Sequence, residues 1–148
     1  MANVRDLLKN KAKKLPIVSI APDATAFDAM KMMAEYNVGA LLVFNAQGEV
    51  AGILSERDFA RKLDVQGHGA KETRVRDIMT EKVLYVESTQ SLNECMVLMS
   101  DKHIRHLPVF EDGQLLGVLS IRDVLREIIM EQESMISHLE HYILGGKP

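Results

Sequence analysis

The sequence predicts an α+β protein with two tandem β-α-β-β-α units, packed as one pseudo-two-fold module, and a long C-terminal helix. Internal repetition is the main observation behind this fold. The segment 117–123, Gly-Val-Leu-Ser-Ile-Arg-Asp, repeats the pattern of 52–58, Gly-Ile-Leu-Ser-Glu-Arg-Asp, 65 positions earlier (117 − 52). Val75–Met79 likewise repeats Val4–Leu8. Repetition on this scale indicates two copies of one supersecondary unit that share a core.

The repeats divide the 148 residues into four parts. We assign a first unit to 1–65, a linker to 66–74, a second unit to 75–130 and a C-terminal helix extension to 131–148. Either unit alone would bury only a modest share of its surface, so we expect the two to pack together. The hydrophobic content of 47% and the charged content of 26% are ordinary for a globular protein.

Charge and hydropathy argue against several classes of partner. A net charge of −3 gives no general reason to bind nucleic acid or an anionic membrane. No apolar run approaches the ~20 residues of a membrane helix, and no signal peptide is recognised, so we expect a cytoplasmic protein. The single cysteine, Cys95, excludes an intrachain disulfide and a multi-cysteine metal site. His68, His138 and His141 lack metal-ligand spacing, so no metal site is predicted.

The elements of the first unit follow from apolar periodicity and from turn residues. The run 38–44 is almost continuously apolar, as in a strand covered on both faces. The predicted order is a helical turn at 4–8, a lysine-rich stretch at 9–14, an extended segment at 16–20, a helix from 22 with apolar Phe27, Met30, Met33 and Ala34, strands at 38–44 and 50–54, and a helix at 55–63.

The second unit repeats this order after a glycine-rich linker at 66–70. The predicted elements are an extended segment at 83–86, a helix at 91–102, strands at 107–110 and 115–119, and a final helix from 120 to about 144. This last helix is far longer than its counterpart. Apolar and polar residues recur on it at steps of three and four, as in a helix that packs on another helix: Leu125, Ile128, Gln132, Met135, Leu139 and Tyr142.

The doubled Gly-h-h-Ser-x-x-Asp motif (h, apolar) resembles that of the CBS-domain family, named for cystathionine β-synthase. The Val-Arg-Asp-h-h segment that heads each unit strengthens the resemblance, which covers nearly the whole chain in two copies. Such a tandem arrangement is called a Bateman module. The resemblance implies a regulatory module that binds adenine nucleotides in the cleft between its two units, with AMP, ADP or ATP as ligands and NAD or S-adenosylmethionine as alternatives.

Two interpretations of the Ser-x-x-Asp motif remain open. Ser55 with Asp58, and Ser120 with Asp123, have the spacing of a capping box, which needs no ligand. The resemblance implies instead that each aspartate accepts hydrogen bonds from ribose hydroxyls, with the serine near ribose or phosphate. The two roles are compatible, because a helix N-terminus also favours an anion.

Basic residues near these motifs are candidates for phosphate binding. Arg57 and Arg122 lie in the first helical turn, where a cation opposes the helix dipole and is explained by a nearby phosphate or by solvent exposure. Arg105-His106 would supply hydrogen-bond donors to the second site, whereas the aligned Gly39-Ala40 leaves room in the first. The lysine-rich stretch 9–14 would supply charge to the first site or form a solvated loop. We therefore predict two unlike sites.

Apolar residues near strand ends are candidates to hold the adenine base: Ile17, Val38, Val83 and Ile104. The full set of predicted nucleotide-binding residues is Ile17, Val38, Ala40, Ser55, Arg57, Asp58, Val83, Ile104, Arg105, His106, Ser120, Arg122 and Asp123. No catalytic residue or catalytic cofactor is predicted. Cys95 aligns with Ala29, which favours a small packed residue over a nucleophile.

The leading hypothesis is a nucleotide sensor that passes its ligand state to an unidentified regulated protein. One alternative is a structural dimerisation module with vestigial ligand sites; another is an enzyme that acts on a nucleotide. An exposed stripe on the final helix would be unusual for a monomer, so the stripe is expected to dock either on its own module or on a second copy. The resemblance to CBS modules, which commonly associate in pairs through helical faces, implies a homodimer.

Overall fold

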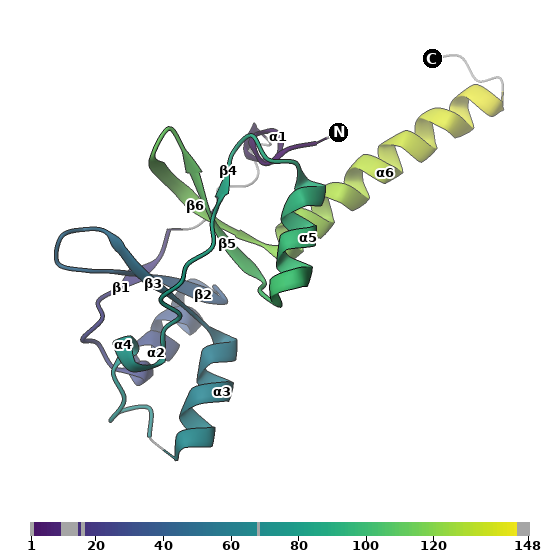
Figure 1. The fold of residues 1–148 in the computed structure, drawn as a ribbon. Helices are drawn as coiled ribbons and strands as arrows, with labels where there is room; N and C mark the ends of the chain where they lie inside the picture. Colours follow the sequence, from purple (N-terminus) through teal and green to yellow (C-terminus); the bar gives the residue numbers. More distant parts are fainter. Residues whose placement is uncertain (1, 10–14, 16, 68, 145–148) are drawn as a thin grey trace. The chain divides into compact units, whose positions relative to one another are not determined.

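The computed structural model describes residues 2–9, 15, 17–67 and 69–144, which fall into two compact units (Figure 1). The central unit spans 16–84, and the terminal unit combines 1–15 with 85–148. Each unit contains helices and its own three-stranded sheet. The α+β class, the two sheets and the long last helix predicted from the sequence are confirmed.

The central unit has a mixed sheet in the order β1-β2-β3. Strand β1 pairs in parallel with β2, and β2 pairs antiparallel with β3. Leu41, Leu42 and Val43 of β2 are fully buried, as the continuous apolar run predicts. Its elements are β1 (Ser19–Ile20), α2 (Ala26–Tyr36), β2 (Ala40–Phe44), β3 (Val50–Ser55), α3 (Glu56–Gln66) and α4 (Val75–Ile78).

The terminal unit repeats the same topology with the order β4-β5-β6. Strand β4 is parallel to β5, and β5 is antiparallel to β6. Both hairpins have a register shift at the equivalent place, between Val43 and Phe44 and between Val109 and Phe110. The elements are α1 (Val4–Lys9), β4 (Val86–Glu87), α5 (Leu92–Lys102), β5 (His106–Glu111), β6 (Gln114–Ser120) and α6 (Ile121–Ile143).

Helices α2 and α5 are capped in the same way at both ends. Thr25 and Ser91 are the N-caps, and their hydroxyls accept hydrogen bonds from the third residue of the helix. Asn37 and His103 end the helices in the left-handed conformation, with φ values of 52° and 55°. The chain can therefore turn directly into β2 and β5. Helix α2 begins at Ala26, later than the sequence predicted, and its buried residues are Ala26, Ala29 and Met33.

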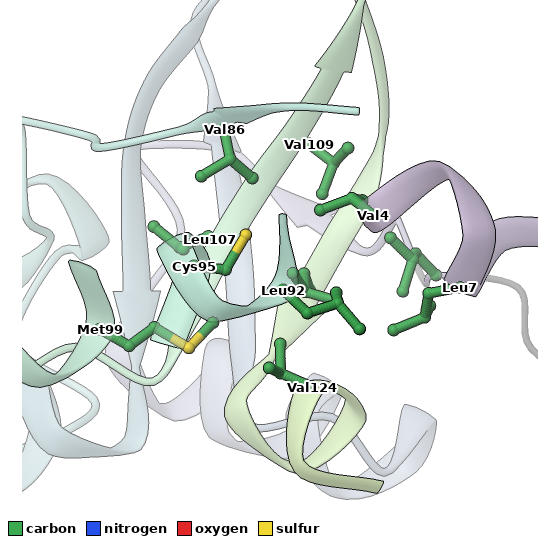
Figure 2. Close-up of a cluster of buried hydrophobic side chains, with 11 residues drawn as sticks. Val4, Leu7, Val86, Leu92, Cys95, Met99, Leu107, Val109 and Val124 are labelled. Carbon is green, nitrogen blue, oxygen red and sulfur yellow. The ribbon is translucent and has the colours of Figure 1, made fainter. Parts of the chain in front are cut away.

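The short helix that heads each repeat packs in the unit formed mainly by the other repeat. Val75 and Ile78 of α4 are fully buried in the core of the central unit. Val4 and Leu7 of α1 are fully buried in the terminal unit, where Figure 2 shows them beside Leu92 and Val109. The repeats in the sequence and the compact units therefore divide the chain differently.

Backbone hydrogen bonds hold each head helix in the same way. The amides of Val4 and Arg5 donate to the carbonyl oxygens of Gln90 and Ser88, just before α5. The amides of Val75 and Arg76 donate to those of Ala24 and Pro22, just before α2. The two head helices are therefore attached in equivalent ways to the residues that precede α5 and α2.

The glycine that opens each repeated motif lies where another segment approaches the strand. A Cβ at Gly52 would lie 2.7 Å from Met79 Sδ and 2.9 Å from the carbonyl oxygen of Thr80. A Cβ at Gly117 would lie 2.4 Å from Leu15 Cβ. Since these distances are shorter than van der Waals contact, only glycine fits without displacement.

Helix α6 packs on the core of the terminal unit only over its first two turns. Val124 is fully buried, and Ile121 and Ile128 pack partly against the same core. From Ile129 to Leu144 every residue is exposed, and Figure 1 shows this part of α6 continuing past α5. Of the stripe predicted from the sequence, Ile128 packs partly against this core, whereas Met135, Leu139 and Tyr142 are exposed.

Candidate functional sites at two strand-to-helix junctions

Both Ser-x-x-Asp motifs lie where the last strand of a sheet leads into a helix. Ser55 ends β3 and Ser120 ends β6. The neighbouring strand starts beside each serine, because Ala40 is paired with Ser55 and His106 with Ser120. The structure therefore brings Ala40 and His106, both predicted from the sequence, to the two junctions.

The residue before the neighbouring strand satisfies the first amide of the helix. In the central unit the amide of Glu56 donates to the carbonyl oxygen of Gly39 at 3.2 Å. In the terminal unit the amide of Ile121 donates to the carbonyl oxygen of Arg105 at 2.8 Å. This bond places the Arg105 backbone next to the start of α6 and removes one of the unpaired donors of a helix N-terminus.

Asp123 closes a complete capping box at the start of α6. Its Oδ2 accepts hydrogen bonds from the Ser120 amide at 3.0 Å and the Ser120 hydroxyl at 2.8 Å. The Asp123 amide donates to the Ser120 hydroxyl oxygen at 3.1 Å. No hydrogen bond from another described residue is made to Oδ1 of this partly buried carboxylate. The cap therefore uses Oδ2 and not Oδ1.

Asp58, at the equivalent position of α3, has partners on both oxygens. Oδ2 accepts from the Ser55 amide at 2.9 Å and from the Ser55 hydroxyl at 3.3 Å. Oδ1 accepts from the Thr80 hydroxyl at 3.2 Å and lies 3.4 Å from Lys62 Nζ. With only 8% of the residue exposed, this carboxylate is more enclosed than that of Asp123. A ligand would have to displace an existing partner from it.

Sequence reasoning missed Lys62 and Thr80, which distinguish the two junctions. Lys62 lies four residues after Asp58 on α3, a spacing that brings side chains together on a helix and was visible in the sequence. It also donates to the carbonyl oxygen of Ile78 at 2.8 Å. Thr80 reaches Asp58 only through the fold, 22 positions along the chain. At the position equivalent to Lys62 the terminal unit has Glu127, so the same ion pair cannot form there.

Capping explains the Ser-x-x-Asp spacing without any ligand. Helices α2 and α5 begin with Thr25-x-x-Asp28 and Ser91-x-x-Glu94 and use the same amide-to-hydroxyl bonds, of 3.1 and 3.0 Å. Helix α6 has this bond too, from the Asp123 amide to the Ser120 hydroxyl oxygen, so the three helices share one structural device. What separates α6 from α2 and α5 must be sought in its surroundings, above all at Asp123 Oδ1.

The predicted phosphate-binding residues are distributed over the same junctions. Arg57 and Arg122 are exposed in the first turns of α3 and α6, and Arg105 is exposed just before β5. His106 is partly buried at the first position of β5. Of the lysine-rich stretch 9–14, Lys9 is exposed at the end of α1, and 10–14 lie outside the described residues.

The four residues predicted to contact a base have different surroundings. Val38 and Ile104 are partly buried against the cores of their own units. Their amides close the ends of α2 and α5 by donating to Met33 and Met99. Ile17, just before β1, is 51% exposed, whereas Val83 is partly buried. Within the central unit, Ile17 is therefore more exposed than Val83.

Cys95 lies in the core, as the sequence comparison with Ala29 predicts. Both residues are fully buried, and Figure 2 shows the Cys95 side chain among Val86, Leu107 and Leu92. Burial, together with the neighbouring Glu94 carboxylate, raises the pKa of the Cys95 thiol to about 11. The described residues contain no cluster of three His, Cys, Asp or Glu side chains that would hold a metal. None of the described helices has the length and apolar character needed to span a membrane.

Comparison with known proteins assigns the chain to a family. Residues 4–65 and 75–130 both match the CBS domain. A mitochondrial CBS domain-containing protein of Arabidopsis thaliana, CBSX3, is 40% identical over 149 residues, which covers 97% of this chain and 72% of that protein. The chain therefore belongs to the CBS-domain family, and it contains two tandem copies of the domain.

Solved structures agree with this assignment. A protein with CBS domains from Burkholderia ambifaria is 44% identical and superimposes with a TM-score of 0.83, covering 88% of this chain and 96% of that one. A CBS-domain-containing protein from Agrobacterium tumefaciens is 33% identical with a TM-score of 0.78, covering 85% and 93%. CBS-domain proteins are generally regulatory and ligand-binding, and these relatives do not carry the names of enzymes.

Proposed function

We propose that this chain is a regulatory module that binds adenine nucleotides and passes its ligand state to a partner protein. The observation that carries the proposal is the free Oδ1 of Asp123, next to an Oδ2 that is held by the cap. A carboxylate oxygen fixed in this way accepts a hydroxyl donor with little further ordering. Ribose offers two adjacent hydroxyls, which suit such an acceptor.

The proposed site at Asp123 is stronger than the one at Asp58. At Asp58 a ribose hydroxyl competes with Thr80 and Lys62 for Oδ1. At Asp123 it meets no competitor among the described side chains. Arg105 and His106 add hydrogen-bond donors for phosphate at the same junction, where the central unit has Gly39 and Ala40. We therefore expect two classes of site, with AMP, ADP or ATP bound first at α6.

The alternative function is a structural dimerisation module whose nucleotide sites are vestigial. It is favoured by the caps of α2 and α5, which show that the motif's spacing has a purely structural use. The regulatory module is expected to copurify with a nucleotide, whereas the dimerisation module is expected to retain none. Mass spectrometry of the small molecules released from purified protein, followed by calorimetric titration with AMP, ADP, ATP, NAD and S-adenosylmethionine, separates them.

The decisive comparison is between Asp123→Ala and Glu94→Ala. Both variants remove the acid of a capping pair in the terminal unit, so both are expected to lower the melting temperature. Only Asp123→Ala removes the proposed ribose acceptor. A hydrogen bond to a charged group contributes about 1.5–3 kcal/mol, so its nucleotide affinity is expected to fall about 10- to 150-fold. Equal affinities in the two variants would leave Asp123 with the capping role alone.

A second comparison tests the inequality of the sites. Replacing Arg105 and His106 together by alanine is expected to weaken the stronger class of site and leave the weaker one nearly unchanged. Asp58→Ala is expected to affect only the weaker class. A wild type with a single class of site, or a uniform loss at both, would contradict the predicted asymmetry.

A further inference from the structure

Three contacts join the start of α3 to the end of α4 and the residues that follow it. Oδ1 of Asp58 accepts a hydrogen bond from the Thr80 hydroxyl at 3.2 Å and lies 3.4 Å from Lys62 Nζ. The Lys62 ammonium group also donates to the carbonyl oxygen of Ile78 at 2.8 Å. We call these contacts, made by Asp58, Lys62, Ile78 and Thr80, the α3 latch. The latch uses the one carboxylate oxygen of Asp58 that the Ser55 cap leaves over, because Ser55 donates only to Oδ2.

The latch holds the last part of the central unit before the chain leaves it. Thr80 and Ile53 exchange two backbone hydrogen bonds, of 3.0 and 2.9 Å, which join this segment to the edge strand β3. The chain then continues to Tyr85, where the terminal unit begins. A ligand that takes Oδ1 from the Thr80 hydroxyl removes a side-chain contact of the same residue whose backbone forms the bridge. Loss of that contact is expected to make local opening of the bridge easier.

The terminal unit has different residues at two positions of the latch. The repeat places Glu127 at the position of Lys62, 65 positions later (127 − 62). It places Lys9 at the position of Thr80, 71 positions earlier (80 − 9), which is also the separation of the two head helices. No described residue other than Ser120 donates to the carboxylate of Asp123. The latch is therefore a specific difference between two junctions with the same backbone topology.

On the basis of the proposed nucleotide-binding function, we propose that the α3 latch keeps the site at Asp58 closed and that a bound nucleotide opens it. The Asp58 side chain is only 11% exposed, so a ribose hydroxyl and the Thr80 hydroxyl compete for Oδ1 in a confined space. Lys62 and Thr80 thus set the affinity of this site. Binding at Asp58 releases the segment that leads to the terminal unit, whereas binding at Asp123 has no such contact to break.

The first test removes one hydroxyl from the latch. Thr80→Val keeps the branched shape of the side chain. Thr73→Val is the matched control, because the Thr73 hydroxyl donates to the carbonyl oxygen of Gly69 at 2.9 Å in the same unit, outside the latch. In calorimetric titrations of the full chain with AMP and with ATP, Thr80→Val is expected to raise the affinity of the weaker class of site about 2- to 13-fold, the value of one ordinary hydrogen bond. Thr73→Val is expected to leave it unchanged.

The second test transfers the latch to the terminal unit. Lys9→Thr combined with Glu127→Lys supplies the hydroxyl and the ammonium group at the positions equivalent to Thr80 and Lys62. This variant is expected to bind nucleotide more weakly at the stronger class of site. Lys9→Val combined with Glu127→Gln is the control, since it supplies neither group, and circular dichroism checks that both variants fold. A transferred latch that binds no more weakly than this control would overturn the proposal.

Amide hydrogen exchange tests the latch separately from binding. In the nucleotide-free chain, the amides of residues 53 and 80 are expected to exchange faster in Thr80→Val than in the wild type or Thr73→Val. Saturating nucleotide is expected to accelerate the same two amides in the wild type. Unchanged exchange and unchanged affinity in Thr80→Val, with two classes of site present, would overturn the latch alone. Absence of the weaker class from both the wild type and Thr80→Val would overturn the proposed nucleotide site at Asp58, and the latch proposal with it.

Discussion

Replacement of Gly52 by alanine tests whether the repeated glycine is required by the approach of a neighbouring segment. The added Cβ would lie 2.7 Å from Met79 Sδ and 2.9 Å from the Thr80 carbonyl oxygen. The methionine side chain can rotate away, because Met is unbranched and flexible. The Thr80 backbone cannot, since Ile53 and Thr80 exchange two hydrogen bonds of 3.0 and 2.9 Å. The clash is therefore expected to strain mainly this bridge, the pair of hydrogen bonds between Ile53 and Thr80.

The expected loss of stability follows from that geometry. Overpacking of a filled site costs about 1–3 kcal/mol. Displacing Thr80 also weakens one or both hydrogen bonds to Ile53, each with a net contribution of about 0.5–1.5 kcal/mol. The lower entropy of unfolded alanine returns about 0.4–1 kcal/mol. We therefore expect Gly52→Ala to lower the free energy of unfolding by about 2–4 kcal/mol.

Two other glycines of the central unit separate this effect from backbone strain. Gly48 has a φ of +77° but nothing within 4 Å of an added Cβ, so Gly48→Ala is expected to cost only the left-handed strain, about 1–2 kcal/mol. Gly69 would place its Cβ 3.8 Å from the Glu72 carboxyl carbon, an ordinary contact. Gly69→Ala is expected to change stability by less than about 0.5 kcal/mol.

The assay combines urea unfolding, followed by circular dichroism, with amide hydrogen exchange. The amides of Ile53 and Thr80 are the local reporters, because both donate in the bridge. Their exchange is expected to accelerate in Gly52→Ala and to remain slow in Gly48→Ala. If Gly52→Ala lost no more stability than Gly48→Ala and kept both amides protected, the steric explanation of the motif's glycine would be wrong.

Three further predictions concern the terminal unit. Leu7→Ala is expected to cost about 2–5 kcal/mol and to reduce amide protection in β4–β6 while sparing β1–β3, because Leu7 is fully buried in that unit; hydrogen exchange checks this. Hydrogen bonds from Ser88 and Arg5 lower the pKa of Glu111 below its ordinary 4.5. At neutral pH the wild type is therefore expected to have a higher melting temperature than Glu111→Gln. This difference is expected to vanish as the pH falls through the lowered pKa of Glu111. Cys95, with its pKa of about 11, is expected to react with a thiol reagent at pH 8 only after unfolding.

The repeats made the strands and helices of each unit predictable, because each copy supports the interpretation of the other. The apolar runs predicted β2 and β5, and the Ser-x-x-Asp spacing predicted the start of α6 with its capping box. The pairing of His106 with Ser120 also follows from the hairpin. These features depend on local spacing, which a single sequence records directly.

Contacts between distant segments were not predictable from the same patterns. The sequence places Val4–Leu8 at the head of the first repeat, whereas α1 packs with 85–144. Thr80 meets Asp58 only because α4 joins the central unit. On α6, helical spacing alone does not reveal how far along the helix the core covers the apolar stripe. Packing against the core reaches Ile128, and the stripe beyond that residue is exposed.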